Sequence, residues 1–309
     1  MQIKDLKVKA VQTIQVLIKS VNVAKNAAQK SYLRFEFVDQ TGTIFANKWS
    51  VKPEEITLFH PGQVVKVKGL IQLYNTQKQI NIETVEPVEG DLDISKYVMA
   101  SAYPADVLKS NIETFVNQMQ EGYYKNIVNA FLSKYETEFY RHPAASRMHH
   151  AFISGLAQHV YEMLKIAAVY CDMYEMLNRE LVYAGIILHD MGKLFEMTCE
   201  NLVSTEYTLE GLMVGHISMM VSLIDEMSKE LECEGEESIL LKHMIIAHHG
   251  KLEWGSPKEP MIAEAELVHY LDVVSAKMTA LETAFKTCEI SQMSERVPML
   301  DNRRFYKHK

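Results

Sequence analysis

Histidine and aspartate residues in the second half of the chain have the types and the spacing of metal ligands. Nine of the 12 histidines lie between His149 and His269. Several of them recur with apolar residues at spacings of three and four, which places them on the inward faces of predicted helices. Imidazole nitrogens and carboxylate oxygens together suit Mn, Fe, Mg or Zn. The candidate ligands are His159, His189, Asp190, His216, His248, His249 and Asp272.

The two aspartates make a metal the best explanation of this pattern. Asp190 follows an apolar run that ends at Leu188, and Asp272 lies next to Leu271 on a largely apolar helix. A buried carboxylate without a partner is costly, and we expect no lysine or arginine on the same helix faces to pair with either one. A single inward histidine is more often a hydrogen-bonded core residue, but the whole set favours metal. The four cysteines form no C-x-x-C pair, so an open catalytic site is favoured over a closed structural zinc site.

Apolar residues at helical spacing predict the helices that carry these ligands. His216 is expected on an inward face, between Leu212 and Met220 at steps of four. The sequence after Gly90 is therefore predicted to be all-α. The predicted helices cover residues 155–171, 179–190, 209–232, 237–249 and 262–288.

The first 90 residues have the alternating pattern of short strands. Five or so strands with one long connection, residues 51–61, suit a small barrel better than a sandwich. The predicted strands within residues 11–88 include 32–37, 44–49, 64–68, 70–74 and 79–85. The chain then divides into a barrel domain (1–90), a helical linker region that packs on the next domain (91–145) and a helical domain (146–309).

Composition and charge narrow the function classes. A hydrophobic fraction of 48% excludes a wholly disordered or collagen-like chain. The net charge of −8 argues against a nucleic-acid partner, but it is unevenly distributed. Residues 1–90 hold 12 basic and 8 acidic residues, a balance of +4, whereas the remaining 20 and 32 give −12. The longest clean apolar run, residues 181–188, is too short to span a bilayer, and with scattered cysteines and no signal-peptide pattern we expect a cytoplasmic protein.

The barrel region resembles an OB-fold of the nucleic-acid-binding type. Asp39, Thr41-Gly42, Ile44 and Trp49 stand where the hairpin signature of that family stands. The resemblance implies contact with single-stranded nucleic acid, in which aromatic rings stack on bases and cations follow phosphates. Alternatively, Trp49 fills the barrel and the lysines only add solubility. The candidates for nucleic-acid binding are Tyr32, Arg34, Lys48, Trp49, Tyr74 and Lys78, together with Arg147 before the first ligand helix.

The helical domain resembles the HD superfamily of metal-dependent phosphohydrolases, in its two-metal form. The motifs that carry this resemblance are residues 154–159 (SGLAQH), 189–193 (HDMGK) and 248–250 (HHG). It implies that one ion is bound by His159, His189, Asp190 and Asp272, and the other by Asp190, His216, His248 and His249. Asp190 would then bridge the ions, a metal-bound hydroxide would be the nucleophile, and Lys193 would donate to the scissile phosphate.

The combination of both domains resembles the YhaM-type 3′→5′ exoribonucleases of Gram-positive bacteria. Further shared motifs are residues 140–150 (YRHPAASRMHH), 205–211 (TEYTLEG), 248–257 (HHGKLEWGSP) and 302–306 (NRRFY). The resemblance implies RNA degradation from the 3′ end to nucleoside monophosphates, single-stranded DNA as a further substrate, and two ions, with manganese favoured and Fe, Mg²⁺ or Zn²⁺ as alternatives. The apolar helical surfaces are compatible with a homo-oligomer. The alternative hypotheses are a phosphohydrolase of small nucleotides with a regulatory OB-fold and a non-catalytic RNA-binding adaptor.

Overall fold

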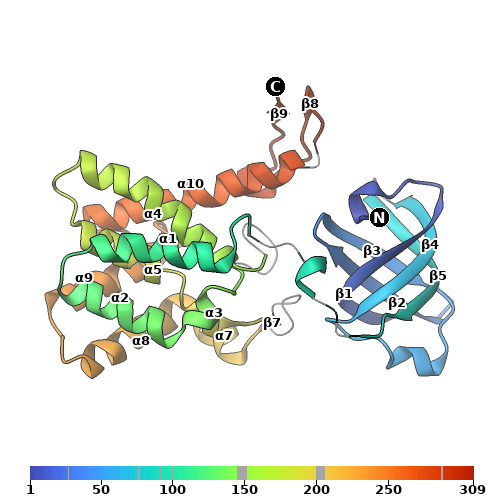
Figure 1. Cartoon of the computed structure of the whole chain (residues 1–309), viewed down its shortest axis with the longest axis horizontal. Coiled ribbons are helices and arrows are strands. Elements are labelled where there is room, and N and C mark those ends of the chain that lie inside the picture. The colour runs from blue at the N-terminus through green and yellow to red at the C-terminus, as the bar shows by residue number, and fades with distance from the viewer. Residues whose placement is uncertain are drawn as a thin grey trace. The chain divides into compact units, whose positions relative to one another are not determined.

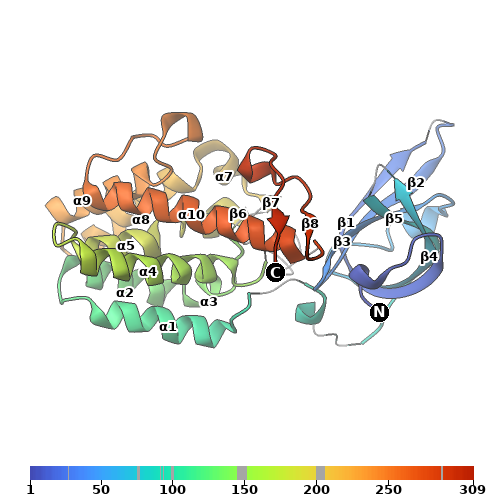
Figure 2. The ribbon, with the colours of Figure 1, turned by 90° about the horizontal axis from the view of Figure 1, so that it is seen from above.

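The computed structural model forms two compact units, which we describe separately (Figures 1 and 2). The first consists of Met1–Ala100 and Thr198–Glu206, and the second of Ser101–Met197 and Tyr207–Lys309. The structure describes residues 1–26, 28–74, 77–90, 92, 94–98, 101–144, 152–199, 206–286 and 288–309.

The N-terminal unit contains a closed five-stranded barrel, which confirms the predicted OB-fold. Its strands follow the order β1-β2-β3-β5-β4, and β3 pairs in parallel with β5 while the other neighbours are antiparallel. The strands are β1 (Val11–Lys25), β2 (Ser31–Asp39), β3 (Gly42–Lys48), β4 (Val64–Tyr74) and β5 (Gln77–Pro87), and the short helices are η1 (Ile3–Asp5), η2 (Pro53–Ile56) and η3 (Ile94–Tyr97).

Alternating side chains fill the barrel. Phe35 and Phe37 on β2 point inward and are fully buried, with ring centroids 5.0 Å apart, and Val65 and Val67 on β4 are buried as well. The residues between them face outward, as the period of two requires. The predicted strands 64–68 and 70–74 are one strand, β4, in which a bulge between Lys68 and Gly69 shifts the register with β5.

Helices make up most of the second unit. They are α1 (Ala105–Gln118), α2 (Tyr123–Lys134), α3 (Glu136–Phe139), α4 (Gly155–Met173), α5 (Arg179–Leu188), α6 (Lys193–Glu196), α7 (Leu209–Val214), α8 (His216–Glu230), α9 (Glu236–Ala247) and α10 (Ala263–Lys286). The short elements η5 (Leu252–Trp254), β8 (Gln292–Met293), η6 (Pro298–Leu300) and β9 (Tyr306–Lys307) complete it, and the two-residue strands β6 (Met197–Thr198) and β7 (Glu206–Tyr207) each have one residue in either unit.

Helix α5 lies at the centre of this unit. Every residue from Leu181 to Leu188 is buried, because α2, α4, α9 and α10 surround the helix (Figures 1 and 2). A helix that is apolar on all faces needs such a position. The centre of the helical core therefore ends directly at His189 and Asp190.

The predicted single helix over residues 209–232 is wrong. Gly215 has φ +76° and ψ 153°, which separates α7 from α8. His216 is therefore the first residue of α8, and its N–H bonds the side chain of Glu196 instead of a carbonyl one turn earlier. Leu212 is 68% exposed and does not share an inward face with Met220, which is fully buried.

No helix within the described parts of the chain is both long enough and apolar enough to cross a membrane.

Gly69 is predicted to be required for the pairing of β4 and β5. A Cβ atom at this position would collide with the carbonyl oxygen of Asn81 and lie 2.7 Å from Cγ2 of Ile80. We expect Gly69→Ala to lower the free energy of unfolding by about 2 kcal/mol or more. Gly235→Ala is the control, because Gly235 has extended backbone and faces only a flexible glutamate, so its change should stay within about 0.5 kcal/mol. Equal urea midpoints for both variants would contradict the prediction.

Candidate metal centre

The predicted ligands converge from five helices of the second unit. His159 is in the second turn of α4, His189 and Asp190 follow the last residue of α5, and His216 begins α8. His248 and His249 follow α9, and Asp272 lies within α10. Residues that are 113 positions apart, His159 and Asp272, come within 3.2 Å of each other. The structure therefore brings all seven predicted ligands together.

The Asp190 carboxylate lies between two groups of histidines. Its Oδ2 is 3.4 Å from Nε2 of His189, and its Oδ1 is 3.6 Å from Nε2 of His216 and 3.8 Å from Nε2 of His248. On the Oδ2 side, Nε2 of His159 lies 3.3 Å from Nε2 of His189 and 3.2 Å from Oδ1 of Asp272. The two oxygens of one carboxylate thus face two different sets of ligand atoms.

Among the residues that the structure describes, two groups of three have ligand atoms close enough to hold an ion each. One consists of His159, His189 and Asp272, and the other of His216, His248 and His249. Within each group the atoms lie within 4.8 Å of one another. All are nitrogen or carboxylate oxygen, which is the donor set of Mn, Fe, Mg and Zn sites.

Each of the five imidazoles is oriented through its Nδ1 atom. Nδ1 of His189 donates to the carbonyl oxygen of Ile186 at 2.8 Å, and Nδ1 of His248 donates to that of Ile245 at 2.7 Å. Hydrogen bonding at Nδ1 leaves Nε2 as the free lone pair of a neutral ring, as metal binding requires. The other three contacts join Nδ1 of His159 to Ser275 Oγ (2.9 Å), of His216 to Glu196 Oε1 (2.9 Å) and of His249 to the Trp254 carbonyl (3.1 Å).

Three buried polar atoms without partners show whether these residues fit an ion. Oδ1 of Asp190, Nε2 of His216 and Nε2 of His248 are buried and have no hydrogen-bond partner among the residues that the structure describes. Buried polar atoms are nearly always satisfied, and these three face one another. A divalent cation would satisfy all three, so the residues fit a metal.

The pKa shifts of His248, His249 and Asp190 suit metal binding, whereas burial lowers the pKa of His189 but the adjacent Asp190 carboxylate outweighs it and raises that pKa. Burial lowers the pKa of His248 well below its ordinary value and lowers the pKa of His249, so both rings are neutral ligands. Burial alone would raise the pKa of Asp190, but the groups around the carboxylate, above all the Lys193 ammonium, outweigh it and hold that pKa well below the usual range. Asp190 is therefore a carboxylate.

Lys193 pairs with Asp190, a contact that the sequence analysis did not predict. The sequence predicted no cation beside either aspartate, yet Nζ of Lys193 donates to Oδ2 of Asp190 at 2.7 Å. The one-turn helix α6 begins at Lys193, three residues after Asp190, so the two side chains lie on the same side of the turn. The Lys193 side chain is 14% exposed, and the Asp190 charge outweighs its burial and raises its pKa, so it stays charged.

Glu196 contributes to the centre although sequence reasoning missed it. Its Oε1 accepts from the backbone N–H of His216 at 3.0 Å and from Nδ1 of the same residue at 2.9 Å. A Cβ atom at Gly211 would collide with the Glu196 carbonyl, so this glycine lets α7 approach α6 closely. The sequence offers one signal, a carboxylate six residues after Asp190, but nothing in it links that position to His216.

The predicted nucleic-acid contacts fall into two sets on the barrel. Tyr32 and Trp49 lie together on its outer face, with ring centroids 4.6 Å apart. Arg34, two residues from Tyr32 on β2, places its guanidinium 5.2 Å from the ring centroid of Phe45, an aromatic residue that sequence reasoning missed. Trp49 is 45% exposed and Phe45 is 38% exposed, so neither fills the barrel interior.

Lys48 and Lys78 bond other groups of the barrel unit and do not join these aromatic residues. Nζ of Lys48 donates to the Ser50 carbonyl at 2.7 Å and lies 3.1 Å from Glu55, and Nζ of Lys78 donates to the Leu6 carbonyl at 2.6 Å. Tyr74 is 68% exposed at the end of β4. Arg147 lies outside the described residues.

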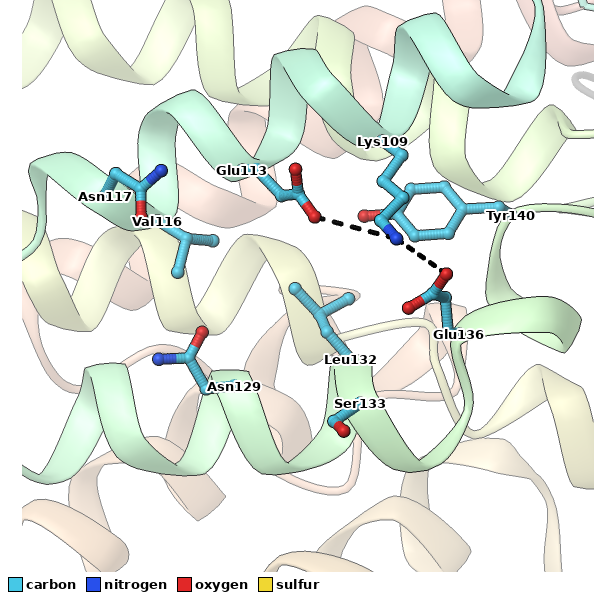
Figure 3. Close-up of a pocket in the computed structure, with 9 residues that line it drawn as sticks. All are labelled: Lys109, Glu113, Val116, Asn117, Asn129, Leu132, Ser133, Glu136 and Tyr140. Carbon is cyan, nitrogen blue, oxygen red and sulfur yellow. Dashed lines mark hydrogen bonds and ion pairs between the residues drawn. The ribbon is translucent and has the colours of Figure 1, made fainter.

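A surface pocket of about 340 Å³ lies among α1, α2 and α3, apart from the ligands (Figure 3). Nζ of Lys109 lies 2.7 Å from Glu136 and 3.9 Å from Glu113 in it. None of its lining residues is a predicted ligand.

Glu196 is predicted to position His216. We expect Glu196→Ala to weaken metal binding by roughly 10- to 100-fold, because the ring loses the acceptor that orients it. Glu196→Gln is the matched variant: its amide oxygen can still accept both bonds, so affinity should fall only a few-fold. Titration of the metal-free variants with Mn²⁺ in a calorimeter measures this. Wild-type affinity in a folded Glu196→Ala protein would contradict the assignment.

Comparisons with known proteins agree with this centre. The family model described as HD domain matches residues 156–277. A protein named 3′-5′ exoribonuclease YhaM from Geobacillus sp. (strain WCH70) is 40% identical over 95% of this chain and 91% of its own length. A protein of the same name from Bacillus subtilis (strain 168) is 38% identical over 94% of this chain and 93% of its own length.

Among solved structures, a domain of replication protein A from Methanococcus maripaludis matches 29% of this chain and 94% of its own, with 16% identity and a TM-score of 0.25. The relatedness to the curated proteins extends over nearly the whole chain and includes both units. This chain belongs to the YhaM family of 3′-5′ exoribonucleases and carries the HD domain of metal-dependent phosphohydrolases in its helical unit.

Proposed function

We propose that this chain is a cytoplasmic 3′→5′ exoribonuclease that hydrolyses single-stranded RNA to nucleoside monophosphates. Family membership supports the reaction class. The observation that carries the mechanism is the position of Asp190, whose two carboxylate oxygens face two separate groups of ligand atoms. Such a carboxylate can bridge two ions.

The first ion would be held by His159, His189, Asp190 and Asp272, and the second by Asp190, His216, His248 and His249. Family membership favours manganese, and the nitrogen and oxygen donor set also suits Fe, Mg²⁺ or Zn²⁺. When bound, two divalent ions offset the charge of the scissile phosphate and acidify a water molecule for in-line attack.

The residues of the chain prepare the centre for this reaction. The Nδ1 contacts hold the imidazoles in one orientation, so that little reorganisation is needed when substrate arrives. Lys193 keeps a proton on Nζ and places a positive charge beside Asp190, where the phosphate of the substrate must approach. The buried body of α5 excludes water from the inner side of the centre.

The outer face of the barrel is proposed to hold the RNA that extends from the active site. Trp49 and Phe45 offer exposed rings for base stacking, Tyr32 adds a half-buried ring against Trp49, and Arg34 adds a cation. Stacking tolerates every base, as a degradative enzyme needs, and it does not read the 2′-hydroxyl, so single-stranded DNA is a further substrate. Lys48, Tyr74, Lys78 and Arg147 stay predictions for the same role.

The proposed domains are an OB-fold over 1–90, a helical region over 91–145 and the HD domain over 146–309. Packing supports assigning the middle region to the helical unit, because Leu108 and Ile112 of α1 and Phe131 of α2 belong to the same buried cluster as α4 and α5. Removing residues 91–145 would therefore open that core.

Asp190→Asn is expected to reduce RNA hydrolysis at least about 100-fold, because the bridging ligand loses its charge at nearly constant volume. Asp225→Asn is the matched control, since Asp225 lies on the surface of α8 and pairs there with Lys229 and Lys242. The assay uses metal-free protein, a 3′- or 5′-labelled single-stranded RNA, and Mn²⁺, Mg²⁺ or Zn²⁺ added separately. Successive loss of 3′ nucleotides with release of monophosphates supports the function. Hydrolysis of small nucleotides with intact RNA would favour the alternative phosphohydrolase.

Trp49→Ala and Arg34→Ala are expected to raise the KM for long RNA by roughly 5- to 100-fold, the equivalent of losing stacking worth about 1–3 kcal/mol per base. The effect on a dinucleotide should be much smaller, because it occupies only the centre. Lys66→Ala removes an exposed cation from β4, which neighbours β1 and β5 and neither β2 nor β3, and serves as the control. Equal effects of all three variants on long RNA would indicate general charge attraction instead of a stacking surface.

A further inference from the structure

The loop after His249 holds an exposed tryptophan next to the metal centre. Trp254 is 48% exposed, and its main-chain carbonyl accepts the Nδ1–H of His249 at 3.1 Å. The residue that orients a ligand thus also presents a large aromatic ring to solvent. The proposed mechanism gives that ring no role.

The start of this loop is fixed by the packing of His269. Gly250 has φ +75°, and a Cβ atom there would collide with the His269 ring. The ring is buried, and its Nδ1 donates to the carbonyl of His248 at 3.1 Å. The Trp254 ring lies beside it, with centroids 5.7 Å apart. The buried His269 ring therefore packs against the Trp254 ring.

The far end of the loop is fixed by Ser256. Its side-chain hydroxyl lies 2.9 Å from the carbonyl of Ile246 and 2.7 Å from that of Lys258, and the residue is 3% exposed. Its backbone N–H donates to the carbonyl of Lys251, as does that of Trp254. The tryptophan therefore has a defined position before any ligand binds, which lowers the entropy lost on binding.

A cation accompanies the ring. Nζ of Lys251 lies 4.7 Å from the Trp254 ring centroid. It is also 3.8 Å from Glu253, but the two side chains are 53% and 72% exposed, so this ion pair is weak and a phosphate can replace it. The exposed ring and the solvent-accessible ammonium that lies over it match the base and the phosphate of a nucleotide, because the flexible lysine side chain can leave the ring face to a base.

We propose that Trp254 and Lys251 form the subsite for the 3′-terminal nucleotide, which rests on the exoribonuclease function proposed above. The terminal base stacks on the exposed ring of Trp254, and Lys251 contacts a phosphate oxygen of the same nucleotide. The link through the Trp254 carbonyl places this subsite one imidazole away from the centre that cleaves the phosphate. Stacking without base-edge contacts explains how one subsite accepts each nucleotide in turn.

Tryptophan fluorescence tests the stacking directly. The chain has two tryptophans, so Trp49→Phe leaves Trp254 as the only one. In the Mg²⁺-loaded variant, adenosine 5′-monophosphate should quench the emission with saturation, whereas ribose 5-phosphate, which has no base, should not. Quenching by adenosine 3′-monophosphate but not by the 5′ isomer would assign Trp254 to the upstream nucleotide and overturn the proposal. The absence of quenching by either would do the same.

Kinetics on a dinucleotide supply the second test. We expect Trp254→Ala to raise KM about tenfold with a smaller change in kcat, and Trp254→Phe to restore most of the affinity. Leu252→Ala removes a neighbouring side chain that is 62% exposed, and it should leave KM unchanged. A wild-type KM in Trp254→Ala would refute the subsite while the exoribonuclease function stood. If the wild-type enzyme left RNA intact, the function itself would fail, and the fluorescence titration would still decide whether a nucleotide binds here.

Discussion

The burial of one carboxylate among five imidazoles is the constraint on which the helical unit depends. Asp190 follows the central helix α5 by two residues and is buried, so its charge must be met by protein groups or cations. Lys193 satisfies one oxygen, while the other has ring nitrogens as neighbours but no hydrogen-bond donor among the described residues. A divalent cation is the chemical group that fits this environment.

The surrounding structure orients the ligands by hydrogen bonds at the atoms that face away from the centre. Nδ1 of His189 and Nδ1 of His248 each bond the backbone carbonyl three residues earlier in the chain. The Nδ1 atoms of the other three rings bond distant or loop groups: Ser275 for His159, Glu196 for His216 and the Trp254 carbonyl for His249. Different elements thus hold each ring, and the orientation depends on the packing of the whole unit. This is why Glu196, which touches no substrate, is proposed to influence metal affinity, and why the Trp254 loop is coupled to His249.

The sequence predicted the fold class because hydrophobic periodicity is a local property. The alternation around Phe35 and the helical spacing around Leu181 each follow from which side of an element is buried. The residues at which helices and strands begin and end were harder to predict. Gly215 divides one predicted helix into two through its positive φ, and the bulge at Gly69, which lies against the Asn81 carbonyl, is part of a single strand that the sequence had predicted as two.

The sequence alone determined which residue types could bind metal, since seven histidines and aspartates recur on predicted inward faces. It could not show that Lys193 pairs with Asp190, that Glu196 holds His216, or that Phe45 joins Arg34. These are contacts of side chains, and their partners depend on how the chain turns between elements. Only the tertiary structure decides them, because the distance between two side chains is set by packing and not by their separation along the chain.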